Sequence, residues 1–408
     1  MNVFVNSRIA LFAGVMILIG AHAGAQVPRV PESSEFRVRL GPLFLNPAIS
    51  LTNAGLDTNV FNEPTSENPK RDFTMTVTPR TDLWLRMGRT WVTGNVREDF
   101  VWYREYASER SVNSRYGAGW VAPLSRVRFA VTGAWVNTRE RPGFEIDVRS
   151  RRSEADLNGA AEIRVLSKTL FGVRGLRRTI DFDRDVMFLG ASLHDELNRT
   201  ETGGSVTIRH ELTPLTTLTL DVSRSQDRFE FSPLRDADST SIGLALGFDP
   251  FALITGNARL GFRDFEPLSS DLPGYRGVTA AVELAYVALD ATRLSVQAMR
   301  DVQYSFDINQ PYYLLTGLAG SLGQQVYGPL DVEGRIGAQQ LAYTDREGAA
   351  AGLSDRTDRL RTYGFGVGYR IGRDLRIGFN VDQQKRQSEV ERRQYEGRRY
   401  ATAVTFGF

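Results

Sequence analysis

Few residues of this chain combine the types and the spacing that catalysis requires. Histidine, the side chain most often used for acid–base work, occurs only 3 times in 408 residues. His194 adjoins Asp195 and Glu196, which suggests a surface acid–base pair, and His210 adjoins Glu211. Neither histidine comes with a nucleophile and oxyanion donors at a matching spacing. We therefore predict loop and rim histidines, no catalytic residues, and a protein that is not an enzyme.

An acidic run resembles part of a calcium loop, because carboxylates at alternate positions can converge on one hard cation. The run consists of Asp181, Asp183 and Asp185. However, Val186 occupies the position where the sharp turn needs glycine, and Ser192 stands where the bidentate glutamate belongs. We predict a solvated acidic loop and no metal site. The alternative is a loose divalent site that bridges lipopolysaccharide phosphates.

The remaining chemical motifs are also weak. Gly364, Gly366 and Gly368 are not a phosphate cradle, because that motif needs a strand leading into a helix, whereas these glycines alternate within one strand. They are expected to keep one strand face smooth or to bend the sheet. The absence of cysteine excludes disulfides, thiolate metal sites and thiol nucleophiles, and a formal net charge of +2 gives no field that would collect nucleic acid. No cofactor-binding residues are expected.

The elements that position these residues are strands. From about residue 43 the chain alternates apolar and polar residues with period 2, as in Ile242 to Phe248, Val278 to Tyr286 and Tyr363 to Tyr369. About 18 strands are expected, with 16 as the alternative. They lie near residues 43–54, 72–87, 90–103, 111–122, 126–138, 153–165, 168–180, 199–210, 215–226, 239–248, 253–264, 277–288, 291–304, 311–323, 329–343, 358–371, 374–386 and 399–408.

The connections alternate in length along the whole chain. Short links such as Met87 to Arg89 and Gly372 to Arg373 alternate with long polar links such as Leu56 to Arg71, Arg139 to Arg152 and Asp181 to Asn198. A transmembrane barrel joins its strands in this way, with short periplasmic turns and long extracellular loops. The fold class predicted is therefore all-β: a transmembrane, antiparallel, up-and-down β-barrel.

On many strands, charged residues occupy the face opposite the apolar one. A dry protein core would exclude these charges, whereas a water-filled lumen would accept them. Acids and bases are nearly balanced there, so no strong ion selectivity is expected. The predicted pore-lining residues are Arg80, Arg115, Arg128, Arg164, Arg209, Arg259, Arg263, Arg293, Arg335, Arg376, Asp156, Glu162, Glu283, Asp331, Glu333 and Asp382.

Aromatic residues cluster near the strand ends, as interfacial girdles do. The outer girdle is predicted to contain Phe73, Phe100, Trp102, Phe262, Tyr304, Tyr343 and Tyr400, and the periplasmic girdle Trp91, Phe248, Tyr369 and Phe406. The apolar segment Val186 to Leu189 is unusual for an exposed loop, so we expect this long loop to fold inward or over the mouth.

The N-terminus is typical of a cleaved export signal. Arg8 precedes the apolar run Ile9 to Ile19, which is too short to span a bilayer, and small residues lead to a cleavage site after Ala25. The predicted organisation is a signal peptide at 1–25, a periplasmic lead at 26–42 and the barrel at 43–408. Most of the lead is expected to be disordered; the alternative is a short strand through Phe36, Val38 and Leu40.

Two features resemble known families. Tyr400, Val404, Phe406 and Phe408 alternate on one face and resemble the last-strand signal by which the barrel-assembly machinery recognises outer-membrane barrels. A second likeness, over about 41–408, is to outer-membrane β-barrel porins associated with exopolysaccharide export loci. It is carried by Gly41-Pro42, Asn46-Pro47, Asp57 to Phe61, Thr213 to Leu220, Phe262-Arg263-Asp264 and Gly274 to Gly277.

The resemblance implies a barrel in the outer membrane of a Gram-negative-type bacterium, surrounded by outer-membrane lipid and lipopolysaccharide. It further implies a conduit for exported polysaccharide, which would depend on separate periplasmic polysaccharide-export proteins. Two alternatives stay open, a general or solute-specific diffusion porin and a plugged surface-structural or adhesion barrel. No nucleic-acid partner is expected.

Overall fold

The computed structural model describes residues 36–408 except 250–251, 290, 349–355 and 408. The predicted signal peptide therefore lies outside the described residues, as does the lead up to residue 35. The described end of the lead contains a short strand, β1 (Val38–Leu40), which pairs with the start of β2. The alternative of a strand in the lead thus holds for these three residues. Among the described residues, no helix is both long and apolar enough to cross a membrane.

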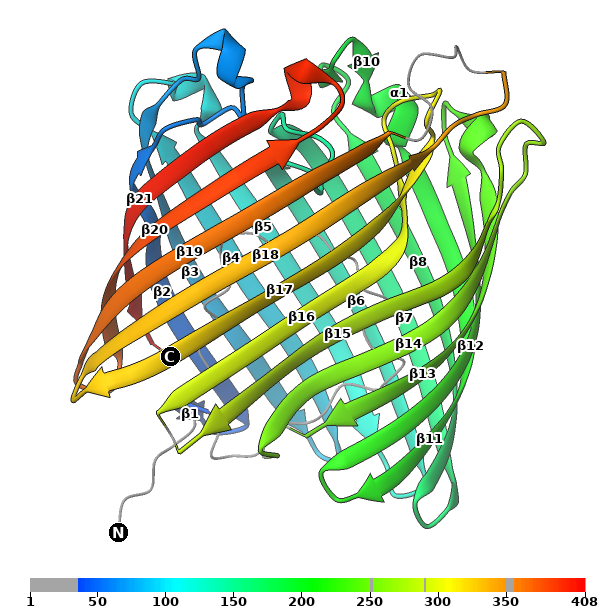
Figure 1. The fold of residues 1–408 in the computed structure, drawn as a ribbon. Coiled ribbons are helices and arrows are strands. Elements are labelled where there is room, and N and C mark those ends of the chain that lie inside the picture. Colours follow the sequence, from blue (N-terminus) through cyan, green and yellow to red (C-terminus); the bar gives the residue numbers. More distant parts are fainter. Residues whose placement is uncertain (1–35, 250–251, 290, 349–355, 408) are drawn as a thin grey trace.

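The chain forms a closed 18-strand antiparallel barrel, as predicted (Figure 1). Each strand pairs with the next along the sequence, and β2 pairs with β21 from Ile49 opposite Phe406 to Asp57 opposite Arg399, which closes the ring. The strands are β2 Leu43–Asp57, β3 Asp72–Met87, β4 Thr90–Tyr103, β5 Ser111–Pro123, β6 Val127–Glu140, β7 Ser150–Leu166, β8 Thr169–Phe182, β11 Arg199–Thr213, β12 Thr216–Phe229, β13 Ala237–Phe248, β14 Ile254–Pro267, β15 Tyr275–Ala288, β16 Thr292–Tyr304, β17 Tyr312–Tyr327, β18 Leu330–Thr344, β19 Thr357–Ile371, β20 Leu375–Gln387 and β21 Tyr395–Phe406.

The connections separate the barrel into a turn end and a loop end. At the turn end, tight links such as 88–89 and 372–374 join the strands, and Gly88 and Gly372 adopt φ angles of 62° and 64° that suit glycine. The loop end carries the long links, which hold the remaining small elements. These are η2 Thr65–Glu67, η3 Ala107–Glu109, β9 Met187–Phe188, β10 Ala191–Ser192, α1 Leu193–Leu197, η4 Pro233–Arg235 and η5 Glu391–Arg393.

The two faces of the wall are inverted relative to a soluble protein. Outward-facing apolar residues such as Leu244, Phe365 and Phe379 are half exposed, whereas the intervening residues face the lumen. Because successive side chains of a strand alternate between faces, the period-2 pattern of the sequence yields one apolar and one polar surface. An apolar outer surface is what a barrel needs in order to sit in lipid.

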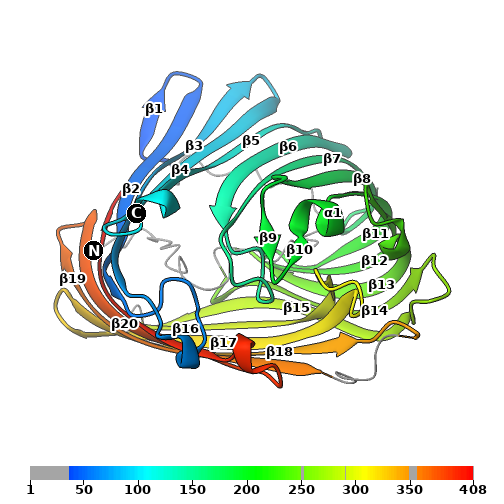
Figure 2. The same ribbon diagram turned by 90° about the horizontal axis from the view of Figure 1, so that it is seen from above.

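The ladder between β15 and β16 stops before it reaches the loop end. Their pairing ends at Ala280 opposite Arg300, whereas β14 pairs with β15 up to Tyr275, and β16 pairs with β17 up to Tyr304. Beyond that point the β16–β17 hairpin lies inside the ring (Figure 2). We call this split the β15–β16 seam.

An apolar cluster fills the overlap at the seam. Val302 and Tyr312 share a strand face with residues that point outward lower down, such as Leu318, yet both are buried here. They pack against Ala237 and Phe265, which belong to the inward face of β13 and β14. The hairpin and the wall therefore form two layers at this part of the loop end.

Three of the residues predicted to belong to the aromatic girdles, Trp91, Tyr343 and Tyr304, do not lie on the outer surface. Phe73, Phe100, Phe262, Tyr369, Tyr400 and Phe406 are exposed on the outer surface. Trp91, however, faces inward and packs on Phe44, with ring centroids 5.7 Å apart. Tyr343 is buried in the lumen beside Tyr313. Tyr304 lies at the seam and contacts the rings of Phe229 and Phe265.

Candidate functional site: the barrel lumen

The predicted pore-lining residues lie on the strand face opposite the exposed apolar side chains. This face follows from the alternation of each strand and from the ladder registers. It carries Arg80, Arg115, Arg128, Arg164, Arg209, Arg259, Arg263, Arg293, Arg335, Arg376, Asp156, Glu162, Glu283, Asp331, Glu333 and Asp382.

Most of these charges form ion pairs, and most of the pairs reach over an intervening strand to the strand beyond it. Arg259 reaches Asp221 at 2.6 Å, and Arg209 reaches Glu162 at 2.7 Å. The other pairs are Arg115 with Asp99 and Glu140, Arg263 with Asp301, Arg335 with Glu333 and Asp382, Arg376 with Asp331, Arg178 with Asp156, and Arg164 with Glu211. The lumen wall is therefore neutralised locally over much of its circumference, and it does not carry a ring of one charge sign.

A few lumen cations differ from this pattern. Within the described part of the chain, Arg80, Arg128 and Arg293 take part in no ion pair. Glu283 likewise lies on the lumen face of β15 without an ion-pair partner among the described residues.

The alternating glycines of β19 make room for neighbouring side chains. A Cβ atom on Gly364 would lie 2.5 Å from Asp382 Oδ1 and 2.7 Å from Arg335 Nε. Gly366 and Gly368 are likewise overlaid by Asn380 and Arg376. The long side chains of β18 and β20 therefore lie flat over β19, which keeps this stretch of the lumen wall smooth, as one of the two sequence interpretations proposed.

A loop between β6 and β7, residues 141–149, crosses the lumen near the loop end; we call it the crossing loop (Figure 2). Asn62 donates a hydrogen bond to Asp147 at 3.2 Å, and Arg141 donates to the carbonyl of Val60 at 2.7 Å. Arg386 of β20 donates to the carbonyl of Phe144 at 3.0 Å. These contacts tether the loop to several distant strands, so it narrows the mouth.

Glu145 is the most deeply buried charged group of the crossing loop. Its carboxylate accepts hydrogen bonds from the Ser305 hydroxyl at 2.6 Å and from the Phe306 backbone N–H at 3.2 Å. Burial raises the pKa of the Glu145 carboxyl, and the guanidinium groups of Arg393 and Arg356 oppose that rise. The loop therefore docks onto the β16–β17 hairpin through a buried carboxyl whose pKa lies above its ordinary value.

Buried arginines hold the same region together. Arg386 pairs with Asp358 at 2.5 Å and with Asp147 at 3.0 Å, and the side chains of Arg386 and Asp358 are fully buried. Arg235, in the loop before β13, donates to the carbonyls of Phe306 and Pro311 at 3.2 and 3.1 Å. Burial lowers the pKa of Arg235, and Glu196 at 2.9 Å counteracts this. The ion pairs of Arg386 thus fix the crossing loop to β19 and β20, and the hydrogen bonds of Arg235 hold the hairpin tip.

The long loop between β8 and β11 covers the mouth from the other side. Phe188 is buried and meets Phe306 edge-on, with ring centroids 4.7 Å apart. It shares an apolar cluster with Ile146 of the crossing loop and with Leu193 and Leu197 of α1. The segment 186–189 thus folds over the mouth, as expected, although Met187 and Leu189 remain partly exposed.

The sequence interpretation took the crossing loop for an ordinary extracellular loop. A signal was present, because Phe144, Ile146 and Val148 alternate with Glu145 and Asp147. Alternation of this kind outside a predicted strand indicates a segment with one buried side. The contacts that bury that side come from segments up to 248 residues away, and no local pattern identifies them.

An aromatic cluster lines the opposite mouth, at the turn end. Phe36 lies 4.6 Å from Phe44 and 5.0 Å from Trp84 between ring centroids, and Trp91 completes the group. The guanidinium of Arg86 lies 5.9 Å from the Trp91 ring. Flat rings beside hydrogen-bonding cations suit a ligand that has both apolar faces and polar edges.

The histidines and the acidic loop residues considered for catalysis or metal binding make other contacts. His194 lies beside Asp195 at 2.9 Å and stacks on Phe231, and Thr169 meets His210 at 3.0 Å. Asp183 approaches Arg151 at 3.8 Å. Among the described residues, no group of three or more potential metal ligands comes together.

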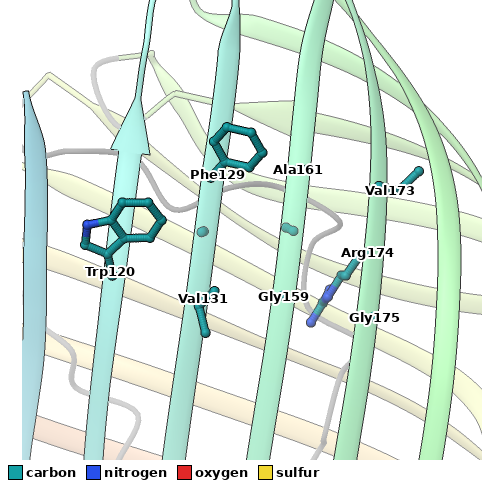
Figure 3. A pocket seen from close by; sticks show the side chains of 10 residues that line it. Trp120, Phe129, Val131, Gly159, Ala161, Val173, Arg174 and Gly175 are labelled. Carbon is teal, nitrogen blue, oxygen red and sulfur yellow. The ribbon is translucent and has the colours of Figure 1, made fainter.

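A hollow on the outer surface is not part of the channel. It lies over β5 to β8, where Trp120, Phe129, Val131 and Val173 surround a floor of small residues that includes Gly159 (Figure 3). The exposed large side chains around it belong to the outward apolar face. It would therefore face lipid rather than solute.

A closed barrel with an apolar exterior, a charged and glycine-lined interior and long loops that narrow one mouth defines an outer-membrane β-barrel channel of the porin type. The chain belongs to the family described as "Putative beta-barrel porin 2", whose model matches residues 37–408. This confirms the predicted family of outer-membrane barrels. No curated protein matches the sequence.

One solved porin shares the fold of the barrel, and a second is somewhat less similar to this chain. A BenF-like porin from Pseudomonas fluorescens Pf-5 is 10% identical, with 90% of this chain and 100% of that chain covered and a TM-score of 0.51. OccK2 (OpdF) from Pseudomonas aeruginosa is also 10% identical, with 89% and 97% covered and a TM-score of 0.49. At this identity the likeness concerns the architecture of the barrel alone.

Proposed function

We propose that this barrel is a passive channel that carries a polysaccharide from the periplasm to the cell surface. The observation that carries the proposal is the aromatic cluster of Phe36, Phe44, Trp84 and Trp91 at the periplasmic mouth. Pyranose rings have apolar faces and hydroxyl edges, so they stack on aromatic rings and bond to charged groups. The locally paired charges of the wall offer hydrogen bonds without selecting an ion.

The proposal includes two groups of partners, one that delivers the polymer and one that inserts the barrel into the membrane. Periplasmic polysaccharide-export proteins would deliver the polymer to the aromatic cluster. The barrel-assembly machinery would recognise the outward-facing Tyr400, Val404 and Phe406 of β21; Phe408, the remaining residue of this signal, lies outside the described residues.

A diffusion porin is the second candidate, and the crossing loop favours it. A loop that is fixed by Glu145, Asp147 and Arg386 across the lumen leaves less room for a polymer than for a small solute. A plugged surface-structural or adhesion barrel would be the extreme case of the same closure. Bilayer conductance separates the two, because a plugged barrel gives no steady current.

The deciding experiment is deletion of the gene, followed by measurement of surface and periplasmic polysaccharide. We expect surface polymer to fall and periplasmic polymer to accumulate. A strain with Trp84→Ala and Trp91→Ala should show the same defect while its purified barrel keeps the ion conductance of the wild type. Unchanged surface polymer in the deletion strain would contradict polysaccharide export, and open-channel conductance would then favour the porin.

A further inference from the structure

Four cations gather on the outer surface of the barrel near the loop end. Arg359 and Arg361 lie on β19, Lys385 on β20 and Arg398 on β21, and all four are exposed. We call them the outer cationic patch. Alternation places Arg359 and Arg361 on the same face of β19 as Tyr363 and Phe365, which are exposed on the apolar exterior.

The ladder register brings the four cations together. Arg361 stands opposite Lys385, and on the next pair of strands Arg398 stands opposite Gln383, two residues from Lys385. Because neighbouring strands lie about 4.8 Å apart and successive residues rise about 3.3 Å, the patch extends over roughly 10 Å across the strands and roughly 13 Å along them. Tyr363 and Tyr400 follow Arg361 and Arg398 on the same strand faces, two residues closer to the turn end, and they lie on the apolar belt. The patch therefore lies at the upper edge of that belt.

The patch is not neutralised by the protein. Glu396 is the one carboxylate, among the described residues, that approaches it, at 3.9 Å from Lys385 and 3.5 Å from Arg398. Arg359 and Arg361 form no ion pair within the described part of the chain.

Outward cations on other strands have partners within the barrel, such as the Thr316 hydroxyl for Arg300 at 2.8 Å and a carboxylate for Arg276 and Arg228. Arg276 meets Asp264 at 2.5 Å, and Arg228 meets Asp238 at 2.6 Å. Arg177 on β8 is also exposed without a carboxylate partner among the described residues, but Leu157 and Thr202 flank it in register. It is a single cation rather than a cluster.

We propose that the outer cationic patch binds the phosphate groups of lipopolysaccharide in the outer leaflet. The long-loop end of a barrel faces the cell exterior, so the upper edge of the apolar belt meets the headgroups of that leaflet. Arginine binds phosphate through two parallel hydrogen bonds. The exposed rings of Tyr363, Phe365, Phe379 and Tyr400 below the patch would contact the acyl chains of the same molecule.

The test uses the full-length barrel purified in detergent and titrated with purified rough lipopolysaccharide. We expect the double variant R359Q/R361Q to bind about tenfold more weakly, since two charge-assisted contacts are lost. The matched control is R177Q, which removes an equally exposed outward arginine and should change affinity less than about twofold. Equal affinity of R359Q/R361Q and wild type, or equal losses in both variants, would overturn the proposal.

Two further arms identify the ligand chemistry. Enzymatic dephosphorylation of the lipopolysaccharide should abolish the difference between wild type and R359Q/R361Q, and inorganic phosphate in millimolar excess should not displace the lipid. Displacement by inorganic phosphate would instead indicate a site for the free ion and would contradict the lipid proposal.

The variant E396Q keeps the test informative if R359Q/R361Q folds poorly. It removes the single carboxylate beside Lys385 and Arg398 and leaves every cation in place. Its affinity for lipopolysaccharide should rise severalfold, and an unchanged or weaker affinity would count against the patch.

Discussion

The Ser305 hydroxyl donates a 2.6 Å hydrogen bond to the carboxylate of Glu145, although 160 residues separate them in sequence. This bond joins the crossing loop to the tip of the β16–β17 hairpin, and Arg235, in the loop before β13, donates to the Pro311 carbonyl and holds that tip against the wall on which the hairpin packs. The narrow mouth of the channel is thus built from two inward-folded segments that hold each other in place.

We expect the docking of the crossing loop to depend on pH through Glu145. Its pKa is raised above the ordinary 4.5 by burial, so the docked state is favoured below that value and weakens as pH rises through the raised pKa. Arg393, Arg356, Tyr313 and Tyr343 face the same carboxyl. Single-channel conductance should therefore be lower at about pH 4 than at about pH 7. The variant E145Q should lose this dependence; if it retains the wild-type pH profile, another group is responsible.

Deleting the loop over the mouth should widen the channel. Removal of residues 183–196 eliminates Phe188, Leu193 and their contact with Ile146. Conductance should rise by roughly twofold or more if this apolar cover restricts the pore. A deletion of loop residues 268–272, at the outer side of the seam, serves as the control. Identical single-channel currents in wild type and the 183–196 deletion would show that the cover lies outside the conduction path.

A side chain on the smooth wall of β19 should narrow the lumen. In G364V the new Cβ would lie 2.5 Å from Asp382 Oδ1, so Asp382 and Arg335 must move toward the lumen. We expect lower conductance and a loss of about 1–3 kcal/mol in unfolding free energy. Gly334 offers the control, because a Cβ there meets nothing within 4 Å. If G334V and G364V give equal currents, the glycines do not set the width of the pore.

The buried ion pairs at the mouth should be worth more than those at the surface. R386A removes the fully buried cation that contacts both Asp358 and Asp147, although Asp358 keeps Arg356 at 2.7 Å and Asp147 keeps Arg393 at 3.7 Å, and it should cost about 1–3 kcal/mol. R224A removes one partner of an ion pair whose arginine side chain is 70% exposed, and should cost at most about 1 kcal/mol. Urea unfolding in detergent micelles measures both. Similar losses would mean that water reaches Arg386.

The absence of cysteine allows the β15–β16 seam to be tested by cross-linking. Ala280 and Arg300 are ladder partners, so cysteines at these positions should form a disulfide under mild oxidation. Cysteines at Gly277 and Gln303 would be partners only if the ladder continued, and these should stay reduced. The disulfide is detected as a mobility shift on a non-reducing gel. Equal yields for the two cysteine pairs would show that the ladder between β15 and β16 continues past Ala280 and Arg300 in solution.

The strands could be predicted from the sequence because alternation is a local property. The predicted range 90–103 matches β4, and 72–87 matches β3, since apolar and polar residues there change at every step. The face of each lumen charge follows from the same rule, which placed Arg259 and Asp331 on the inner wall. The start of β21 is predicted less accurately, at residue 399, because the ladder with β20 continues back to Tyr395.

The errors arise where the face depends on distant parts of the chain. Trp91 was assigned by its place near a strand end, although its alternation with Val92 and Thr93 already puts it on the inner face. Tyr304 follows the outward pattern of β16, and only the departure of the hairpin from the ring buries it. No local pattern reports that departure or the position of the crossing loop.

The seam also determines what separates the lumen from the membrane at that point. Elsewhere along β15 and β16 a molecule passing sideways would have to break backbone hydrogen bonds, whereas beyond Ala280 and Arg300 it would have to displace side chains such as Val302 and Phe265. Apolar side chains lose little when their neighbours become hydrocarbon chains and lose much when their neighbours become water. The barrier to lateral passage through the wall is therefore low for an apolar molecule and high for a hydrated one. At the seam, the wall discriminates between molecules by their polarity.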